Sequence, residues 1–304
     1  MHGLASLAMR SRVHAVMMVA VLAILSILFP PASILSTALV ALVTLRSGAS
    51  AGAVLLLLAS AAGGVLALLL FGSVMPIVGF VLLMWLPLML LALLLRGGRS
   101  LALALQGALV LSLLMLASQY LQSEDPVTVW RTLLAPFVET LVEAQIVVAT
   151  EQALLVDRMA EWMPGVVVAG FFLQLMVTLL LARWWQAKLY NPGGFRSEFH
   201  QLRLPRYLLI ATLLYFGLVM MIGSGALEFR YITMLLLSGW FLGGLALVHG
   251  TVYRMKMGIG WLIGVYLLLV MAMPHVIVLL AAAGMADGWF DFRARIRSVN
   301  GPNE

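Results

Sequence analysis

Long uncharged apolar blocks alternate with short polar segments along the whole chain. Most blocks approach the ~20 residues with which an α-helix crosses the ~30 Å hydrocarbon core of a bilayer. The pattern therefore predicts an all-α, polytopic transmembrane helix bundle with about eight to ten membrane segments. The apolar blocks are 13–45, 51–71, 74–95, 101–121, 165–182, 207–227, 231–253 and 259–286.

Prolines divide two of these blocks. Pro30 and Pro31 interrupt the first, because proline lacks a backbone donor and clashes with the preceding turn. We therefore expect two short helices, 13–29 and 32–45, that meet at the far surface of the membrane. Pro274 leaves two alternatives for the last block: a single long tilted span, or a hairpin, which we favour.

The segment 122–163 is polar where the others are apolar. It carries seven of the twelve acids of the chain and two of its eighteen bases. Asp125 and Pro126 have the order of a helix N-cap followed by proline in the first turn, and apolar residues such as Leu133 and Phe137 recur at helical spacing. We expect one or two amphipathic helices on the external face, serving either as a solvated connector or as a lid over an external pocket.

Composition excludes water as the main solvent. Hydrophobic residues make up 63% of the chain and charged residues 10%, compared with roughly 45–50% and about 25% in soluble domains. Soluble enzymes, nucleic-acid-binding domains and disordered regulators are therefore excluded, in spite of the net charge of +6. The absence of cysteine excludes disulfides, thiolate metal sites and a cysteine nucleophile.

The placement of charge predicts the orientation. With the N-terminus in the cytoplasm, the segments on that side before the tail collect twelve bases and one acid, whereas the opposite side collects three bases and eight acids. By the positive-inside rule, this asymmetry predicts a multi-pass protein with a cytoplasmic N-terminus. The tail is cytoplasmic if Pro274 turns the chain and external if it does not.

These features divide the chain into four parts. The predicted parts are N-terminal transmembrane helices at 1–121, an external amphipathic helical segment at 122–163, C-terminal transmembrane helices at 164–286 and an interfacial tail at 287–304.

One cytoplasmic loop combines turn chemistry with arginine. The Asn-Pro-Gly-Gly run at 191–194 ends the preceding helix. Phe195, Phe199 and Leu202 follow at i, i+4 and i+7, which predicts a short interfacial amphipathic helix. The loop either grips a partner or an anionic headgroup, or simply anchors a positively charged surface. Its candidate binding residues are Arg196, Glu198, Arg203 and Arg206.

A second candidate lies where the last block ends. Its aromatic residues favour the membrane boundary, and Asp291 can pair with Arg295 if the segment is helical. The segment is either a surface anchor or, together with the loop at 196–206, a docking site; the second alternative requires the hairpin at Pro274. The candidate residues are Asp287, Trp289, Asp291 and Arg293.

These two regions carry a resemblance. The runs GFRSEF at 194–199, LRLP at 202–205 and DGWFDFR at 287–293 resemble the YybS-like family of bacterial polytopic membrane proteins, whose function is unknown. The resemblance implies the bacterial inner membrane and a distant similarity in fold to the substrate-binding S-components of vitamin transporters. This chain differs from a six-helix S-component in its additional apolar blocks and in the segment 122–163.

Ionisable residues are nearly absent from the blocks, which argues against a proton pump or an ion channel. The polar candidates within the membrane are Gln106, Gln174 and His275. His275 follows a proline that frees a carbonyl, so it either lines a cavity or hydrogen-bonds to a neighbouring helix. Glycines four residues apart, as at 239–243 and 260–264, predict close helix contacts.

The sequence favours a non-enzymatic membrane protein that binds a small or lipidic ligand as a transporter-like subunit. No HExxH motif, GxSxG motif or carboxylate pair falls within a block, so we expect no catalytic residue, metal or cofactor. The alternative is a scaffold that recruits envelope-biogenesis partners through the arginine-rich loop and the tail. The expected partners are the lipid bilayer and either a membrane protein or a small molecule, and not nucleic acid.

Overall fold

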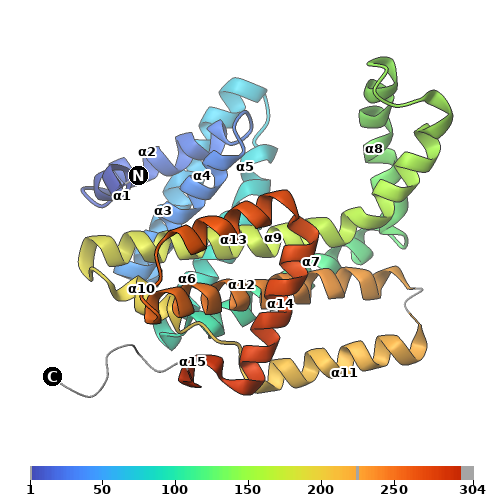
Figure 1. Ribbon diagram of the computed structural model, residues 1–304. Coiled ribbons are helices and arrows are strands. Elements are labelled where there is room, and N and C mark those ends of the chain that lie inside the picture. Colours follow the sequence, from blue (N-terminus) through green and yellow to red (C-terminus); the bar gives the residue numbers. More distant parts are fainter. Residues whose placement is uncertain (1, 224–225, 296–304) are drawn as a thin grey trace. The chain divides into compact units, whose positions relative to one another are not determined.

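The computed structural model describes residues 2–223 and 226–295, and every regular element in these residues is a helix (Figure 1). Within this described part, six helices are long and apolar enough to cross a membrane, and four shorter apolar helices accompany them. The all-α membrane class predicted from the apolar blocks is confirmed. The chain divides into two compact units, one formed by residues 1–108 and 173–202, the other by 109–172 and 203–304.

The first unit is built on three helices that pack against one another, α2, α3 and α4 (Figure 1). The predicted break at Pro30 and Pro31 is confirmed, because α2 ends at Leu25 and Pro31 begins α3, where its missing N–H is tolerated. The first four helices are α1 (His2–Ala8), α2 (Arg12–Leu25), α3 (Pro31–Ser47) and α4 (Ala49–Phe71).

A single residue, Gly48, joins α3 to α4. Its φ of +93° lies in a region that side chains other than hydrogen rarely allow. Further along, a Cβ at Gly52 would collide with the side chain of Thr44, so this glycine lets the two helices close tightly at their junction. The end of α3 and the start of α4 are therefore held next to each other.

The next span contains a π-helical turn. It comprises α5 (Met75–Phe80), η1 (Val81–Trp85) and α6 (Leu86–Gly98), which run on without interruption. The N–H of Leu86 donates to the carbonyl of Val81, five residues earlier, and the next residue is Pro87, which has no N–H to continue the ordinary α pattern. After α6 the chain enters α7 (Leu101–Gln122).

The predicted amphipathic helix after residue 122 is present as α8 (Pro126–Glu143). Asp125 caps it, with Oδ1 accepting from the N–H of Val127 at 3.0 Å and Oδ2 accepting from the hydroxyl of Thr128 at 2.5 Å. The hydrogen bond from Thr128 is the main reason why the pKa of Asp125 is lowered. The apolar residues Leu133 and Phe137 remain 60% and 54% exposed, as expected for a helix that lies on a membrane surface.

The expected boundary between residues 163 and 164 does not coincide with a helix end. After the short η2 (Ala149–Glu151), α9 (Gln152–Tyr190) continues for 39 residues and contains Pro164. The second amphipathic helix expected within 122–163 is therefore the first part of α9, and Ile146 lies in the connection before it. Charge along this stretch shows where a helix leaves the apolar environment and does not require the helix to stop there.

The second unit is centred on the contact between α12 and α14, which cross in Figure 1. Their backbones touch: a Cβ at Gly284 would meet the carbonyl oxygen of Trp240 and would lie 2.8 Å from the backbone nitrogen of Gly244. The remaining helices are α10 (Gly194–His200), which belongs to the first unit, and α11 (Arg206–Ile222), α12 (Leu227–Arg254), α13 (Gly260–Met271), α14 (Met273–Phe290) and α15 (Phe292–Arg295).

The last apolar block is broken beside Pro274, so the alternative of one long span is wrong. Ala272, at φ −132° and ψ 44°, separates α13 from α14, and the chain changes direction there (Figure 1). The close contacts expected for Gly260 and Gly264 are absent, since nothing lies within 4 Å of a Cβ at either position and α13 buries no residue. The part of the predicted tail at 296–304 lies outside the described residues.

The glycine contact gives a first prediction. Gly284→Val should lower the free energy of unfolding by about 1–3 kcal/mol, because backbone atoms cannot move aside as a flexible side chain can. The measurement is thermal unfolding of the purified protein in detergent micelles. Gly264→Val on α13 is the matched control and should unfold at the wild-type temperature; equal shifts for the two variants would contradict the proposed packing.

Candidate functional site

Two of the predicted candidate regions meet in the second unit through Arg203. Its Nη1 lies 2.7 Å from Oδ2 of Asp291, and its Nη2 donates to the carbonyl of Gly288 at 3.2 Å. Asp291 has φ +51° and ends α14, so it is outside a helix. The helix that the pair with Arg295 requires is therefore interrupted at Asp291, and the pair with Arg295 stays a prediction; the structure shows the guanidinium of Arg203 beside this carboxylate.

A buried ion pair lies beside this contact. Asp287 and Arg293, 1% and 6% exposed, approach to 3.0 Å, and Arg254 at the end of α12 donates to the carbonyl of Arg293. Burial lowers the pKa of the Arg293 guanidinium, and the carboxylate of Asp287 opposes that shift. These contacts connect the end of α14 to the end of α12, so the role of this cluster is to stabilise the fold.

The other candidates of the loop and tail have different surroundings. Glu198 of α10 forms a bidentate ion pair with Arg183 of α9, with one N–O distance of 2.9 Å. Arg196 on α10 and Arg206 at the start of α11 are exposed, and Trp289 is 56% exposed. The short helix expected in the loop is confirmed as α10.

The three polar candidates within the membrane have different surroundings. The amide of Gln106 donates to the carbonyl of Ala102 in its own helix at 3.0 Å. His275 is exposed in the first turn of α14, and no hydrogen bond from its ring to another described residue is present. A hydrogen bond from His275 to a neighbouring helix is therefore not seen among the described residues, and the interpretation that it lines a cavity stays a prediction.

Gln174 lies in a small hollow of the first unit. Its Nε2 donates to Ser33 Oγ at 2.9 Å, and Met84 of the π-helical turn lies at 3.4 Å. The hollow has a volume of about 260 Å³, slightly below the ~300 Å³ at which ligand pockets begin. Because the amide already has partners, it stabilises the packing beside the π turn.

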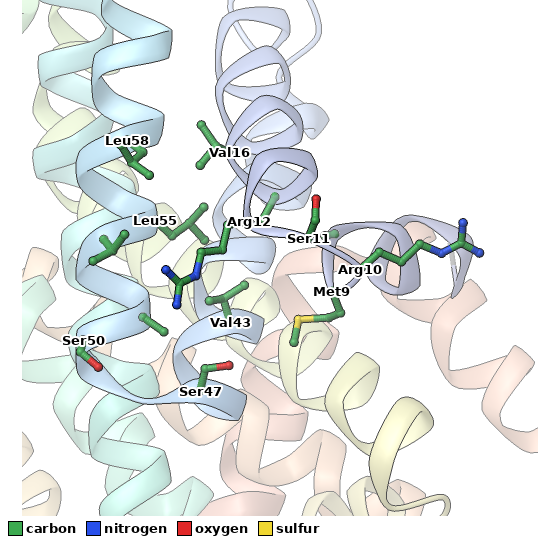
Figure 2. A pocket seen from close by; sticks show the side chains of 14 residues that line it. Met9, Arg10, Ser11, Arg12, Val16, Val43, Ser47, Ser50, Leu55 and Leu58 are labelled. Carbon is green, nitrogen blue, oxygen red and sulfur yellow. The ribbon is translucent and has the colours of Figure 1, made fainter.

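A larger cavity, of about 420 Å³, lies among α1, α2, α3 and α4 of the first unit. Figure 2 shows the guanidinium of Arg12 lying between α4 and the end of α3; Arg10, in the turn between α1 and α2, also borders the cavity. Ser47 and Ser50 are at the same end. Aliphatic side chains form the wall, namely Val16, Val43, Val54, Leu55 and Leu58.

Local sequence explains how this polar end is formed. Ser11 caps α2 by accepting from the N–H of His14 at 3.3 Å, which sets Arg12 as the first helical residue. Gly48 makes the tight joint between α3 and α4, so Ser47 and Ser50 are the last residue of one helix and the second of the next. Neither serine hydroxyl has a hydrogen-bond partner among the described residues.

The cavity is in a region of uncompensated positive charge. No acid precedes Glu124, and the one acid of the first unit, Glu198, is paired with Arg183. Other cations of the unit have neutral partners: the guanidinium of Arg46 lies 4.2 Å from the ring centroid of Tyr190, and Arg96 donates to the carbonyl of Leu45 at 2.6 Å. No described residue forms an ion pair with Arg12.

This site was absent from the residues selected by sequence. Its signal is the Arg-Ser-Arg run at 10–12 in a stretch that contains no acid. That signal points to positive charge, but it does not show that Ser47 and Ser50, almost 40 residues further along, would face the same space. A third hollow, which α4 lines on one side and α5 and η1 line on the other, has a volume of about 480 Å³, and Ser60 supplies its only polar side chain among the lining residues.

The chain matches no protein-family model, no curated protein and no solved structure. The resemblance to the YybS-like family therefore stays a prediction. Within residues 2–223 and 226–295, no group of three or more His, Cys, Asp or Glu side chains is arranged to hold a metal ion.

The buried ion pair gives a second prediction. Asp287→Asn should lower the free energy of unfolding by about 3–5 kcal/mol, because it leaves the buried guanidinium of Arg293 without its counterion. Asp157→Asn is the matched control, since the ion pair of Asp157 with Arg131 is exposed and should contribute less than about 1 kcal/mol. Thermal unfolding in detergent compares the two variants. If Asp287→Asn unfolds at the same temperature as Asp157→Asn, or higher, the buried ion pair does not stabilise the fold.

Proposed function

We propose that the protein is an integral membrane protein that binds a lipidic or other amphiphilic small molecule without changing it chemically. The cavity among α1 to α4 carries this proposal, because it has a cation and hydroxyls at one end and aliphatic side chains along its wall. An amphiphile has the same division between a polar and an apolar end. The volume of about 420 Å³ lies within the range of ligand pockets, ~300–1,000 Å³.

The surroundings of the two best-placed serines support binding without catalysis. Ser50 stands in a Gly-Ala-Ser-Ala-Gly run at 48–52, which has the spacing of a hydrolase nucleophile motif. That motif works at a turn between a strand and a helix, beside a histidine base. Here the run joins two helices, and none of the residues that line the cavity is histidine, aspartate or glutamate.

Ser11 has a histidine partner but no complete triad. Its hydroxyl lies 2.6 Å from Nδ1 of His14, as part of the cap of α2. A serine nucleophile also needs a third group that orients the histidine. The one acid of this unit, Glu198, is engaged by Arg183. Binding of a ligand, as in a transporter-like subunit, is therefore the function that these residues support.

A variant that fills the cavity tests the proposal. Leu58→Trp should reduce the amount of amphiphile that stays bound during gentle purification by at least about fivefold. The larger ring occupies space that the ligand needs, and this overlap should weaken the binding free energy by about 1 kcal/mol or more. Native mass spectrometry measures the bound fraction. Leu69→Trp, on the same helix and 76% exposed, is the matched control and should retain the ligand. Equal ligand content in both variants contradicts the proposal.

Only some of the residues proposed for the scaffold alternative are available on the surface to bind a partner. Arg203, Asp291 and Arg293, three of the residues on which it relied, form contacts within the second unit. Arg196 and Arg206 are exposed. A scaffold that uses these two arginines would lose co-purifying proteins in the double variant Arg196→Ala and Arg206→Ala, whereas a ligand-binding protein would keep its bound amphiphile.

We also propose the bacterial inner membrane as the location, with a cytoplasmic N-terminus. The distribution of arginine and lysine among the loops supports this orientation, and the cysteine-free chain offers a clean test. Thr150→Cys, before α9, should react with a membrane-impermeant maleimide applied to intact spheroplasts. Ser197→Cys, on α10, should react only after permeabilisation. Both positions are exposed, so the reverse pattern would invert the proposed topology.

A further inference from the structure

We propose that the ligand of the cavity among α1 to α4 is an anionic glycerophospholipid, with its phosphate at Arg12, Ser47 and Ser50 and one acyl chain along the aliphatic wall. This inference rests on the proposed function and specifies the chemical class of the ligand. It follows from the charge of the site, from its hydrogen-bond donors and from the exposed aliphatic wall of the cavity.

Charge selects an anion. The first unit contains eight bases and one acid, and that acid is paired with Arg183. Arg12 points into the cavity (Figure 2), and none of the residues lining the cavity is acidic. An arginine at the edge of a bilayer is stable when its charge is compensated. Arg12 is exposed and no lining residue supplies a carboxylate, so its guanidinium is accessible to an anionic headgroup of the membrane.

The donors of the site suit a phosphate. A guanidinium binds phosphate oxygens in a planar, bidentate way. The hydroxyls of Ser47 and Ser50 are available to donate, and the first turns of α2 and α4 both border the cavity through Arg12 and Ala51. Helix N-termini favour negative charge. The opposing C-terminal end of α3 is partly covered, because the carbonyl of Leu45 accepts from Arg96.

The wall distinguishes a lipid from a free phosphate. Beyond the polar end, the cavity is bordered by Val16, Leu55 and Leu58 (Figure 2). Val54 and Leu58 are 43% and 48% exposed, so this flank opens toward the surroundings of the helices, which are lipid in a membrane-spanning unit. An acyl chain fills such a wall, whereas inorganic phosphate leaves it empty.

The same residues select among lipids. A zwitterionic headgroup adds a cation for which the lining offers no carboxylate, and diacylglycerol lacks the charge that Arg12 requires. We therefore expect phosphatidylglycerol to bind more tightly than phosphatidylcholine or diacylglycerol. Charge-assisted hydrogen bonds are the stronger class, so Arg12 should dominate the preference and the serines should refine it.

The experiment uses the full chain, stripped of lipid in a non-ionic detergent. Phosphatidylglycerol, phosphatidylcholine, diacylglycerol and inorganic phosphate are titrated separately, and binding is measured by native mass spectrometry and by the shift of the unfolding temperature. Arg12→Ala should weaken phosphatidylglycerol binding by about tenfold or more, and Arg12→Lys by less. Arg99→Ala, in the same unit, exposed and not among the residues that line the cavity, should bind within about twofold of wild type.

The outcomes separate this inference from the proposed function. If Leu58→Trp reduces binding but all lipids bind equally and Arg12→Ala has no effect, the cavity holds an amphiphile and the anionic preference is wrong. If Leu58→Trp binds every lipid as wild type does, the cavity is not the site, and both proposals fall. If inorganic phosphate stabilises the protein as much as phosphatidylglycerol does, the ligand is a soluble anion and the lipid assignment is wrong.

Discussion

A bilayer supplies almost no water, so every charged or hydrogen-bonding group of this chain has to find its partner in the protein or at the membrane surface. Some buried polar groups satisfy this constraint directly, whereas others, such as the indole N–H of Trp185 and the hydroxyl of Tyr231, have no hydrogen-bond partner among the described residues. The indole of Trp85 donates to Ser36, whose hydroxyl donates to the carbonyl of Val19. The buried carboxylate of Asp287 has the guanidinium of Arg293 beside it. Close helix contacts at glycines, such as that between Gly284 and the backbone of α12, complete the packing.

Much of the fold follows from this constraint and was predicted from sequence alone. The apolar blocks locate most of the membrane helices, and prolines locate two breaks, because an interrupted hydrogen-bond ladder is costly without water. Helix ends were less accurate. Pro164 lies inside α9 even though the residues before it are charged. A helix remains the best solution for the backbone on both sides of a membrane boundary, so polarity by itself does not mark its end.

The candidate site was harder to predict, because it depends on which side chains meet. Arg203 and Asp291 are 88 positions apart and were selected for their chemistry, yet they bind each other and so fulfil a structural role. Sequence supplies no distance between such residues. Conversely, Ser47 belongs to no motif, and the Gly-x-Ser-x-Gly run around Ser50 lacks the strand and the histidine of a hydrolase site. The two serines become notable because Gly48 brings the ends of two helices together beside Arg12.

Arginine in the first unit shows how the same constraint leads from fold to function. The guanidinium of Arg46 lies over the ring of Tyr190, and that of Arg96 donates to the carbonyl of Leu45 at the end of α3. Arg183 forms an ion pair with Glu198. Each of these cations thereby stabilises the packing of its own unit. Arg12 instead faces a cavity with hydroxyls and an aliphatic wall. A cation that contributes nothing to the internal packing, in a unit with no spare acid, is suited to a ligand that brings its own negative charge.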